Sequence, residues 1–151
     1  MIIIDDCSYD GSKKIIKEFM KRDGRIKLIE LDQNKGPALA RNIGTKIARG
    51  NYIAFLDSDD IWMPEKLETQ IGLMESNGAN FCYSSYFIID EQDKLIDVYT
   101  ILTIRVSYYQ LLRTNSIGTL TAIYNADRIG KFEMQNIKSK DYALWLKILK
   151  K

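Results

Sequence analysis

Short apolar runs and amphipathic segments follow one another through the first half of the chain. The apolar run at 1–4 is typical of a parallel strand covered on both faces. A helical pattern follows it, and Asp23-Gly24 predicts where that helix ends. Two further strands are predicted at 25–31 and 51–56, each followed by another helical pattern. This alternation predicts right-handed parallel crossovers and a three-layer α/β/α sandwich.

The pattern becomes mixed in the second half of the chain. Apolar runs at 80–89 and 94–102 flank the polar stretch DEQD and predict a hairpin. A short helix is predicted at 107–112 and a further strand at 118–125. A closing helix at 141–151 is apolar on most of its surface and should pack against an extensive partner. The predicted fold class is therefore α/β with a mixed, mainly parallel sheet.

Composition narrows the chemistry that this fold can carry. With 151 residues, 46% of them hydrophobic, the chain is predicted to be one globular domain over 1–151. The net charge of +2 offers no strong field for nucleic acid, and no apolar run is long enough to span a bilayer. The two cysteines favour reduced thiols in a cytoplasmic protein. The absence of histidine excludes Ser-His-Asp catalysis and a His-ligated zinc.

Acidic residues stand at the ends of two predicted strands. Asp5-Asp6 follow the first strand, and Asp57, Asp59 and Asp60 follow the third. Ligands of such folds bind beyond the carboxyl ends of parallel strands. Two like charges about 4 Å apart repel by roughly 4 kcal/mol at an effective dielectric near 20, which a divalent cation with oxygen ligands relieves. The alternative is that each carboxylate is a turn or helix-cap residue.

Three blocks of sequence carry a family resemblance. They are IIIDDCSYDGS, then NKGPALARNIGTKIARGNYIAFLDSDD, and finally KDYALWLKIL. In this order and spacing they resemble the family 2 glycosyltransferases, which have the GT-A nucleotide-sugar fold, a Rossmann-like α/β/α domain. The resemblance covers essentially the whole chain and implies a nucleotide-binding half at 1–78 and an acceptor and sugar half at 79–151.

The resemblance assigns the nucleotide to residues of the first half. It implies that Asp6 or its neighbour Asp5 recognises the base, usually uracil. It also implies that Arg41 approaches the nucleotide, where its fixed donor fork suits a carbonyl or a phosphate. Asn34 and Gly36 are interpreted as residues that shape the preceding loop. On sequence alone Arg41 could equally be a surface charge on a helix.

The acidic run matches the D-x-D signature of the family. Asp59 is implied as the firmest ligand of Mg²⁺ or Mn²⁺, with Asp57 near the metal or the ribose and Asp60 in support. Such an ion neutralises the diphosphate leaving group. Thr119 and Thr121 resemble the segment that lines the donor sugar, although a half-buried strand explains them as well.

Asp141 aligns with the general base of the family, which takes the proton of the acceptor hydroxyl in an inverting transfer. Lys140 stands where the family commonly has glutamate. The alternative for Asp141 is an ordinary acidic residue in the first turn of a helix.

Family members normally begin with a further strand and helix, of the type V-S-I-I-P-x-Y-N. Relative to that pattern the chain is short at both ends, so 2–4 would form an unpaired apolar edge that favours self-association. A fragment, a degraded gene and complementation by a partner chain each explain this.

The resulting hypothesis is a cytoplasmic, metal-dependent, inverting glycosyltransferase, peripheral to the inner face of the membrane. It would use a UDP-sugar and a saccharide or lipid-linked acceptor in cell-surface polysaccharide assembly. The alternative is a catalytically weak nucleotide-sugar-binding remnant or assembly partner. A haloacid-dehalogenase-type phosphatase and a nucleotidylyltransferase fit less well, because their further motifs do not appear.

Overall fold

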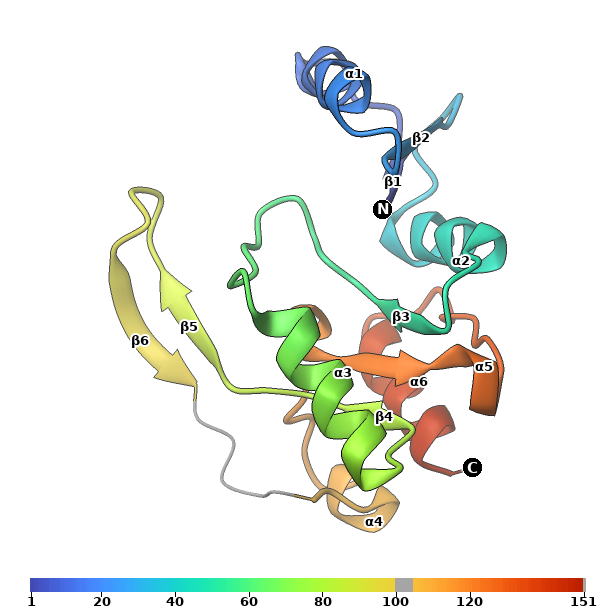
Figure 1. The fold of residues 1–151 in the computed structure, drawn as a ribbon, viewed down its shortest axis with the longest axis vertical. Coiled ribbons are helices and arrows are strands. Elements are labelled where there is room, and N and C mark those ends of the chain that lie inside the picture. The colour runs from blue at the N-terminus through green and yellow to red at the C-terminus, as the bar shows by residue number, and fades with distance from the viewer. Residues whose placement is uncertain (100–104, 151) are drawn as a thin grey trace. The chain divides into compact units, whose positions relative to one another are not determined.

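The computed structural model describes residues 1–99 and 105–150 (Figure 1). The chain forms two compact units. The first unit comprises Met1–Arg49 and Lys131–Lys140, and the second comprises Gly50–Gly130 and Asp141–Lys151. These boundaries differ from the functional halves predicted at 1–78 and 79–151, and that functional division stays a prediction.

The first unit is a strand–helix–strand–helix arrangement, as its pattern predicts. Its two strands pair in parallel, with Ile3 opposite Leu28. Pro37 occupies the first helical turn of the second helix, where its missing N–H costs nothing. The elements are β1 (Ile2–Asp5), α1 (Ser12–Arg22), β2 (Lys27–Glu30) and α2 (Pro37–Ile47).

The apolar residues of β1 are only half-buried, although the sequence predicts a strand covered on both faces. Ile2, Ile3 and Ile4 each retain intermediate exposure. In the part of the chain that the structure describes, β1 pairs with β2 alone. The covering of this strand is therefore incomplete.

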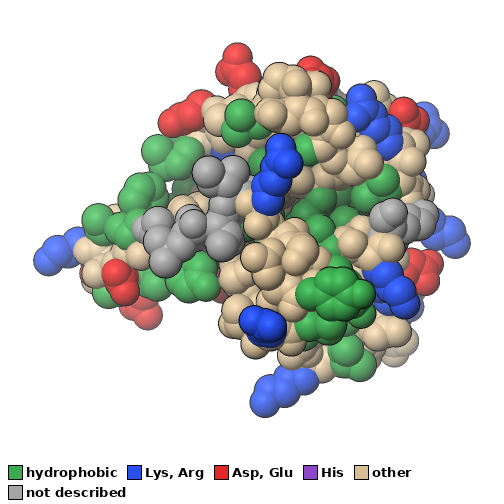
Figure 2. Space-filling model, turned by 90° about the horizontal axis from the view of Figure 1, so that it is seen from below, with side chains coloured by type: hydrophobic (Ala, Val, Ile, Leu, Met, Phe, Trp, Pro, Cys, Tyr) green, Lys and Arg blue, Asp and Glu red, His purple; other side chains and the backbone are tan. Residues whose placement is uncertain are grey.

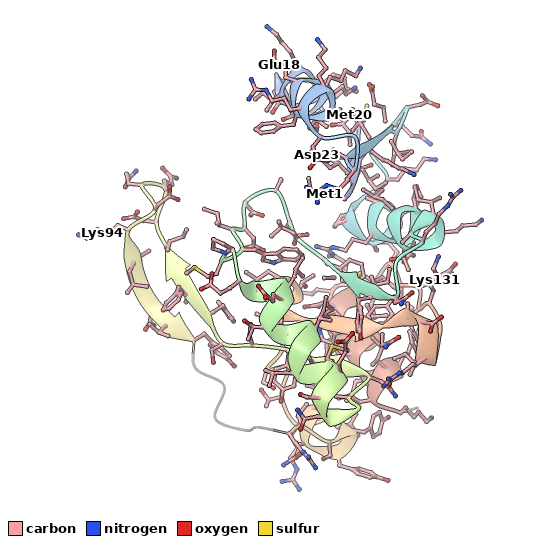
Figure 3. All side chains as sticks on the ribbon, in the orientation of Figure 1. Met1, Glu18, Met20, Asp23, Lys94 and Lys131 are labelled. Atoms are coloured by element: carbon pink, nitrogen blue, oxygen red, sulfur yellow. The ribbon has the colours of Figure 1, made fainter. Side chains whose placement is uncertain are left out.

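Residues 131–140, which are distant from α2 in sequence, are hydrogen-bonded to it. The side-chain amide of Asn42 donates to the carbonyl of Met134 at 2.9 Å and accepts from its backbone N–H at 2.7 Å. Lys131, labelled in Figure 3, donates its ammonium to the carbonyls of Lys46 and Ala48 at 3.0 and 2.6 Å. A lysine at the carboxyl end of a helix satisfies carbonyls that lack helical partners and complements the helix dipole.

The second unit is built on a three-stranded antiparallel sheet of order β3-β7-β4. Helix α3 lies in front of this sheet in Figure 1 and helix α6 behind it. The elements are β3 (Tyr52–Ala54), α3 (Lys66–Asn77), β4 (Phe81–Cys82), β5 (Tyr86–Ile89), β6 (Leu95–Tyr99), α4 (Tyr108–Leu111), the 3₁₀ turn η1 (Thr119–Thr121), β7 (Ile123–Asn125), α5 (Ala126–Ile129) and α6 (Lys140–Leu149).

The core of the second unit centres on Trp145 of α6, which has no exposed surface. Its ring lies 6.3 Å from the ring of Phe55 and 5.4 Å from that of Phe81. Leu144 and Ile148 of the same helix are also buried. The closing helix therefore packs against an extensive surface, as its nearly continuous apolar pattern predicts.

Strands β5 and β6 form a separate two-stranded hairpin with exposed apolar side chains. Phe87 and Val98 stand opposite each other and are 57% and 44% exposed. Leu95 and Ile96 are 55% and 64% exposed. Figure 2 shows apolar side chains gathered over this hairpin, and Figure 3 shows Lys94 at its tip.

The structure corrects several predicted elements. The strand predicted at 118–125 is a strand only from Ile123, because residues 119–121 form a 3₁₀ turn. The run at 80–89 splits into β4 and β5, and residues 100–102 of the run at 94–102 lie outside the described residues. The α/β class and the mixed sheet are confirmed. However, β1–β2 is the parallel pair, and the other described pairs are antiparallel.

In residues 1–99 and 105–150, none of the helices is long and apolar enough to cross a membrane.

Candidate active site

Asp6 of the first unit is held by the loop that precedes α2. The backbone N–H groups of Lys35 and Gly36 donate to its two carboxylate oxygens at 2.7 and 2.8 Å. The side chain of Asn34 donates to the Asp6 carbonyl at 3.3 Å. Gly36 has φ +79° and ψ 161°, a conformation that is essentially restricted to glycine. Asn34 and Gly36 thus shape the loop, as the sequence predicts, and they fix the position of the Asp6 carboxylate.

Asp5 is buried, with only 4% of its surface exposed. Burial raises its pKa, but hydrogen bonds from Ser8 and the ion pair with Lys13 outweigh that effect, so the pKa of Asp5 lies below its ordinary value. The ammonium of Lys13 lies 3.4 Å from this carboxylate and also faces Glu30 at 3.7 Å. The structure thus gives Asp5 a role in the packing of the first unit, and its predicted role at the nucleotide stays a prediction.

Arg41 lies on α2, half-buried, with a guanidinium nitrogen 3.8 Å from the sulfur of Met134. At the other end of the predicted nucleotide residues, β1 ends at Asp5, and Cys7, which follows Asp6, has φ +67°. A positive φ is uncommon outside glycine and is often found at functional turns. The residues predicted to approach the nucleotide thus lie on two elements of the first unit. Asp5 and Asp6 lie at the carboxyl end of β1, and Arg41 lies on α2.

The acidic residues that match the D-x-D signature form a tight turn in the second unit, which we call the acidic loop (57–60). The Asp60 backbone N–H donates to the Asp57 carbonyl at 3.2 Å, which places Ser58 and Asp59 at the centre of a β-turn. Asp59 is exposed, whereas Asp57 and Asp60 are half-buried. Phe55, two residues before the loop, is anchored in the core against Trp145. The strand predicted at 51–56 is shorter in the structure, because β3 ends at Ala54 and the acidic loop follows it after Phe55 and Leu56.

The donor set of the acidic loop fits a hard divalent cation. In residues 1–99 and 105–150 there is no cluster of three or more Asp, Glu, Cys or His side chains of the kind that encloses a metal. Magnesium sites need no such cluster, since one or two carboxylates together with substrate phosphates usually hold the ion. The carboxylates of Asp57 and Asp59 are oxygen donors of the type that such an ion prefers, and Asp59 is exposed.

Asp141 lies in the first turn of α6, half-buried. One of its carboxylate oxygens, Oδ2, accepts a hydrogen bond from the hydroxyl of Thr119 at 3.3 Å. Thr121, by contrast, is 1% exposed and donates its hydroxyl to the Gly118 carbonyl at 2.8 Å. The structure therefore brings together Thr119 and Asp141, which the sequence treats separately. The predicted sugar contacts of Thr119 and Thr121 stay predictions.

Four residues near the Thr119–Asp141 pair were not predicted as site residues from the sequence. Trp62 donates its indole N–H to the Leu120 carbonyl at 2.9 Å, and the Lys66 ammonium lies 4.4 Å from the centre of the Trp62 ring. Gln70 is buried and accepts from Lys66 at 2.6 Å. Burial lowers the pKa of Lys66.

Tyr86 is the fourth of these residues. Burial raises the pKa of Tyr86, and the neighbouring Tyr99 and the Asp60 carboxylate add to this shift. The tryptophan two residues after the acidic loop was the one signal in the sequence that could have indicated this group.

Comparison with known proteins identifies the family of this chain. The family model described as Glycosyl transferase family 2 matches residues 1–134. The chain belongs to this family, so the predicted family membership is confirmed. The putative teichuronic acid biosynthesis glycosyltransferase TuaG of Bacillus subtilis is 38% identical over 152 residues. The Escherichia coli enzyme WfgD, named as UDP-Glc:alpha-D-GlcNAc-diphosphoundecaprenol beta-1,3-glucosyltransferase, is 39% identical over 150 residues.

Solved structures establish the fold. Staphylococcus aureus TarS 1–349 in complex with UDP-GlcNAc superimposes with a TM-score of 0.73 at 20% identity, over 98% of this chain and 43% of TarS 1–349. The mannosyltransferase PcManGT of Pyrobaculum calidifontis, in complex with GDP-Man and Mn²⁺, gives 0.66 at 16% identity, over 97% of this chain and 41% of that one. The predicted GT-A fold class is thereby confirmed.

The alignments also measure how much of each relative is matched. They include 100% of this chain and 60% of TuaG, and 99% of this chain and 58% of WfgD. The chain thus spans about three fifths of the length of these relatives.

Proposed function

We propose that this chain transfers a sugar from a nucleoside-diphosphate sugar, a UDP-sugar, to an acceptor hydroxyl with inversion at the anomeric carbon. The observation that carries the proposal is the arrangement within the second unit. A carboxylate-bearing turn at 57–60 follows β3 after Phe55 and Leu56. A second carboxylate, that of Asp141 in the first turn of α6, accepts a hydrogen bond from the Thr119 hydroxyl. The names of the relatives and neighbours, which specify UDP-Glc, UDP and UDP-GlcNAc, support the choice of donor.

The nucleotide is assigned to residues of the first unit together with Asp57. The carboxylate of Asp6 is fixed by two backbone N–H groups and keeps further lone pairs that can accept from the imide N–H of uracil. Arg41 supplies a charged fork for a base carbonyl or a phosphate oxygen.

Asp57 and Asp59 are proposed to hold Mg²⁺ or Mn²⁺, and Asp60 to support the loop and the sugar. When bound, such an ion acts as a Lewis acid that neutralises the diphosphate as it leaves. The complex of PcManGT with GDP-Man and Mn²⁺ supports this cofactor. The protein's own contribution is to keep the carboxylates in a turn anchored by Phe55, so that little reorganisation accompanies binding.

Asp141 is proposed as the general base. It takes the proton of the acceptor hydroxyl while the acceptor oxygen bonds to the anomeric carbon. The bond from that carbon to the phosphate oxygen breaks, and its electron pair leaves with the diphosphate. Inversion requires the base to act on the side opposite the leaving group. Lys140, the preceding residue, replaces a glutamate that is common in the family.

The proposed acceptor is a saccharide or a lipid-linked saccharide in cell-surface polysaccharide assembly. The names of TuaG, in teichuronic acid biosynthesis, and of WfgD, with its diphosphoundecaprenol acceptor, support this class. The proposal places the chain in the cytoplasm, at the inner face of the membrane, and includes self-association through the β1 edge as a contact between copies.

Release of UDP from UDP-sugars in the presence of Mn²⁺ tests the proposal. We expect turnover with at least one UDP-sugar and a fall of at least about 100-fold in Asp141→Asn, in line with the usual contribution of general base catalysis. Asp127→Asn, which changes an exposed carboxylate of α5 in the same unit, serves as the control and should keep full activity.

Unchanged turnover in Asp141→Asn would remove the base role. UDP binding without turnover of any donor by the unsubstituted chain would instead favour the alternative of a nucleotide-sugar-binding remnant or assembly partner.

A further inference from the structure

Within the second unit, one short segment contacts both Trp62, two residues after the acidic loop, and the proposed base Asp141. This segment, Gly118–Thr121, is called the 118–121 turn. Trp62, which follows the acidic loop, donates its indole N–H to the Leu120 carbonyl of the turn at 2.9 Å. The next residue back, Thr119, donates its hydroxyl to Oδ2 of Asp141 at 3.3 Å. These contacts therefore link Trp62 to the proposed base through the backbone of the turn.

The 118–121 turn is itself held from several directions. The buried amide of Gln70 donates to the Thr121 carbonyl at 2.9 Å. The Thr121 hydroxyl and backbone N–H both donate to the Gly118 carbonyl, at 2.8 and 3.0 Å. Tyr86 lies against Gly118, since a Cβ at Gly118 would lie 3.4 Å from its ring, in van der Waals contact. A hydroxyl carried by such a turn has a fixed position, and a fixed hydroxyl can select one orientation of a neighbouring carboxylate.

We propose that Thr119 and Trp62 are positioning residues for Asp141. The proposal rests on the function proposed above and deepens it. The Thr119 hydroxyl engages Oδ2 and leaves Oδ1 to receive the proton of the acceptor hydroxyl. Trp62 acts one step further away, because it fixes the turn that carries Thr119. The orientation of the base thereby depends on a residue that lies two positions after the acidic loop.

Measurements of kcat and of the KM for the donor distinguish a positioning role of Thr119 from a direct contact of Thr119 with the donor sugar. A positioning role predicts that Thr119→Val lowers kcat by about 10- to 100-fold while the KM for the donor stays the same, because a small misplacement of a reacting group costs rate rather than binding. Thr119→Ser keeps the hydroxyl and should restore most of the rate. A direct contact with the donor sugar would instead raise the KM for the donor in Thr119→Val. Such a rise, with kcat unchanged, would overturn the proposal.

Trp62→Phe removes the indole N–H and keeps an aromatic ring beneath Lys66. It should lower kcat less than Thr119→Val does, because it acts through the turn. Thr69→Val makes the same change as Thr119→Val at an exposed position of α3 and serves as the matched control. It should leave kcat unchanged.

A double-mutant cycle provides the decisive measurement. In the Asp141→Asn background, Thr119→Val and Trp62→Phe should have almost no further effect on turnover, because residues that act through Asp141 lose their role when it is neutralised. The melting temperatures of the same set should also be non-additive for Thr119 with Asp141, which tests the contact without reference to activity.

The outcomes distinguish the two proposals. Full turnover in Thr119→Val, or additive losses in an active enzyme, would overturn the positioning role alone. Absence of turnover in the unsubstituted chain would contradict the proposed function and the positioning role with it. Reduced kcat with non-additive losses and rescue by serine would support both.

Discussion

At the scale of single residues, the backbone conformation of Gly36 fixes the position of the Asp6 carboxylate. Gly36 holds φ +79° and ψ 161°, which side chains rarely adopt, and its N–H holds Asp6. The space around it is open, because a Cβ there would meet no atom within 4 Å. Strain, and not a clash, therefore makes glycine necessary at this position.

We predict that Gly36→Ala lowers the free energy of unfolding by about 1–3 kcal/mol, the usual cost of a residue held in such a conformation. It should also weaken UDP binding, because a shifted backbone N–H at position 36 would no longer hold the Asp6 carboxylate in place. Urea denaturation and calorimetric titration measure the two effects. Gly24→Ala, another open position but without a positive φ, should show neither. Equal losses in the two variants would contradict the conformational explanation.

Asp5 provides a pH-dependent prediction. Its pKa in the folded chain lies below the ordinary value of 3.8, so its ionised form stabilises the fold above that value and the contribution is lost as pH falls through the folded value. Asp5→Asn should be less stable by about 1–2 kcal/mol at pH 7, the scale of a hydrogen bond to a charged group. The deficit should shrink below about pH 4.

Thermal unfolding as a function of pH measures the effect of Asp5→Asn. Glu18→Gln changes an exposed carboxylate of α1 and should leave the curve unchanged. A deficit that persists undiminished at low pH would show that ionisation of Asp5 is not its source.

At the scale of elements, α6 contributes the largest buried side chain of the second unit. Trp145→Ala should lower the free energy of unfolding by about 3–5 kcal/mol, through lost transfer energy and a cavity between Phe55 and Phe81. The same truncation at Tyr109, which is 78% exposed on α4, should change stability little. Urea denaturation compares them, and similar midpoints would contradict the packing described for α6.

The β5–β6 hairpin makes a different prediction, because its apolar side chains are exposed. Joint replacement of Phe87, Leu95 and Ile96 by threonine should reduce binding of a fluorescent apolar dye to the folded chain and leave its melting temperature nearly unchanged. A large fall in melting temperature would show that these side chains stabilise the fold.

The sequence predicted most elements because their patterns are local. The helices at α1, α2 and α6 follow apolar periodicity, Pro37 and the Asp23-Gly24 stop, all of which act within one helix. Residues 119–121 were predicted as strand, since GTLTAIYN has strand composition throughout. Their 3₁₀ turn depends instead on hydrogen bonds from Trp62 and Gln70, which lie far away in sequence. Likewise the Thr119–Asp141 contact joins residues separated by 22 positions, and no local pattern predicts it.

At the scale of the whole molecule, the predicted functional residues are distributed over two compact units. The predicted nucleotide residues Asp6 and Arg41 belong to the first unit, and the acidic loop and Asp141 belong to the second. A ligand that binds the folded chain and not the unfolded chain stabilises the fold. UDP with Mn²⁺ should therefore raise the melting temperature of the chain, and differential scanning calorimetry measures the shift. An unchanged melting temperature at saturating UDP would contradict the proposed nucleotide binding.

Calorimetric titration of UDP with and without Mn²⁺, on the unsubstituted chain and on Asp59→Asn, tests the central claim most directly. The account predicts that Mn²⁺ tightens UDP binding to the unsubstituted chain by at least about 10-fold and that Asp59→Asn loses most of this gain, because the ion joins the carboxylates to the diphosphate. Asp127→Asn should retain the gain in full. A metal effect of undiminished size in Asp59→Asn would contradict the claim that the acidic loop holds the cation.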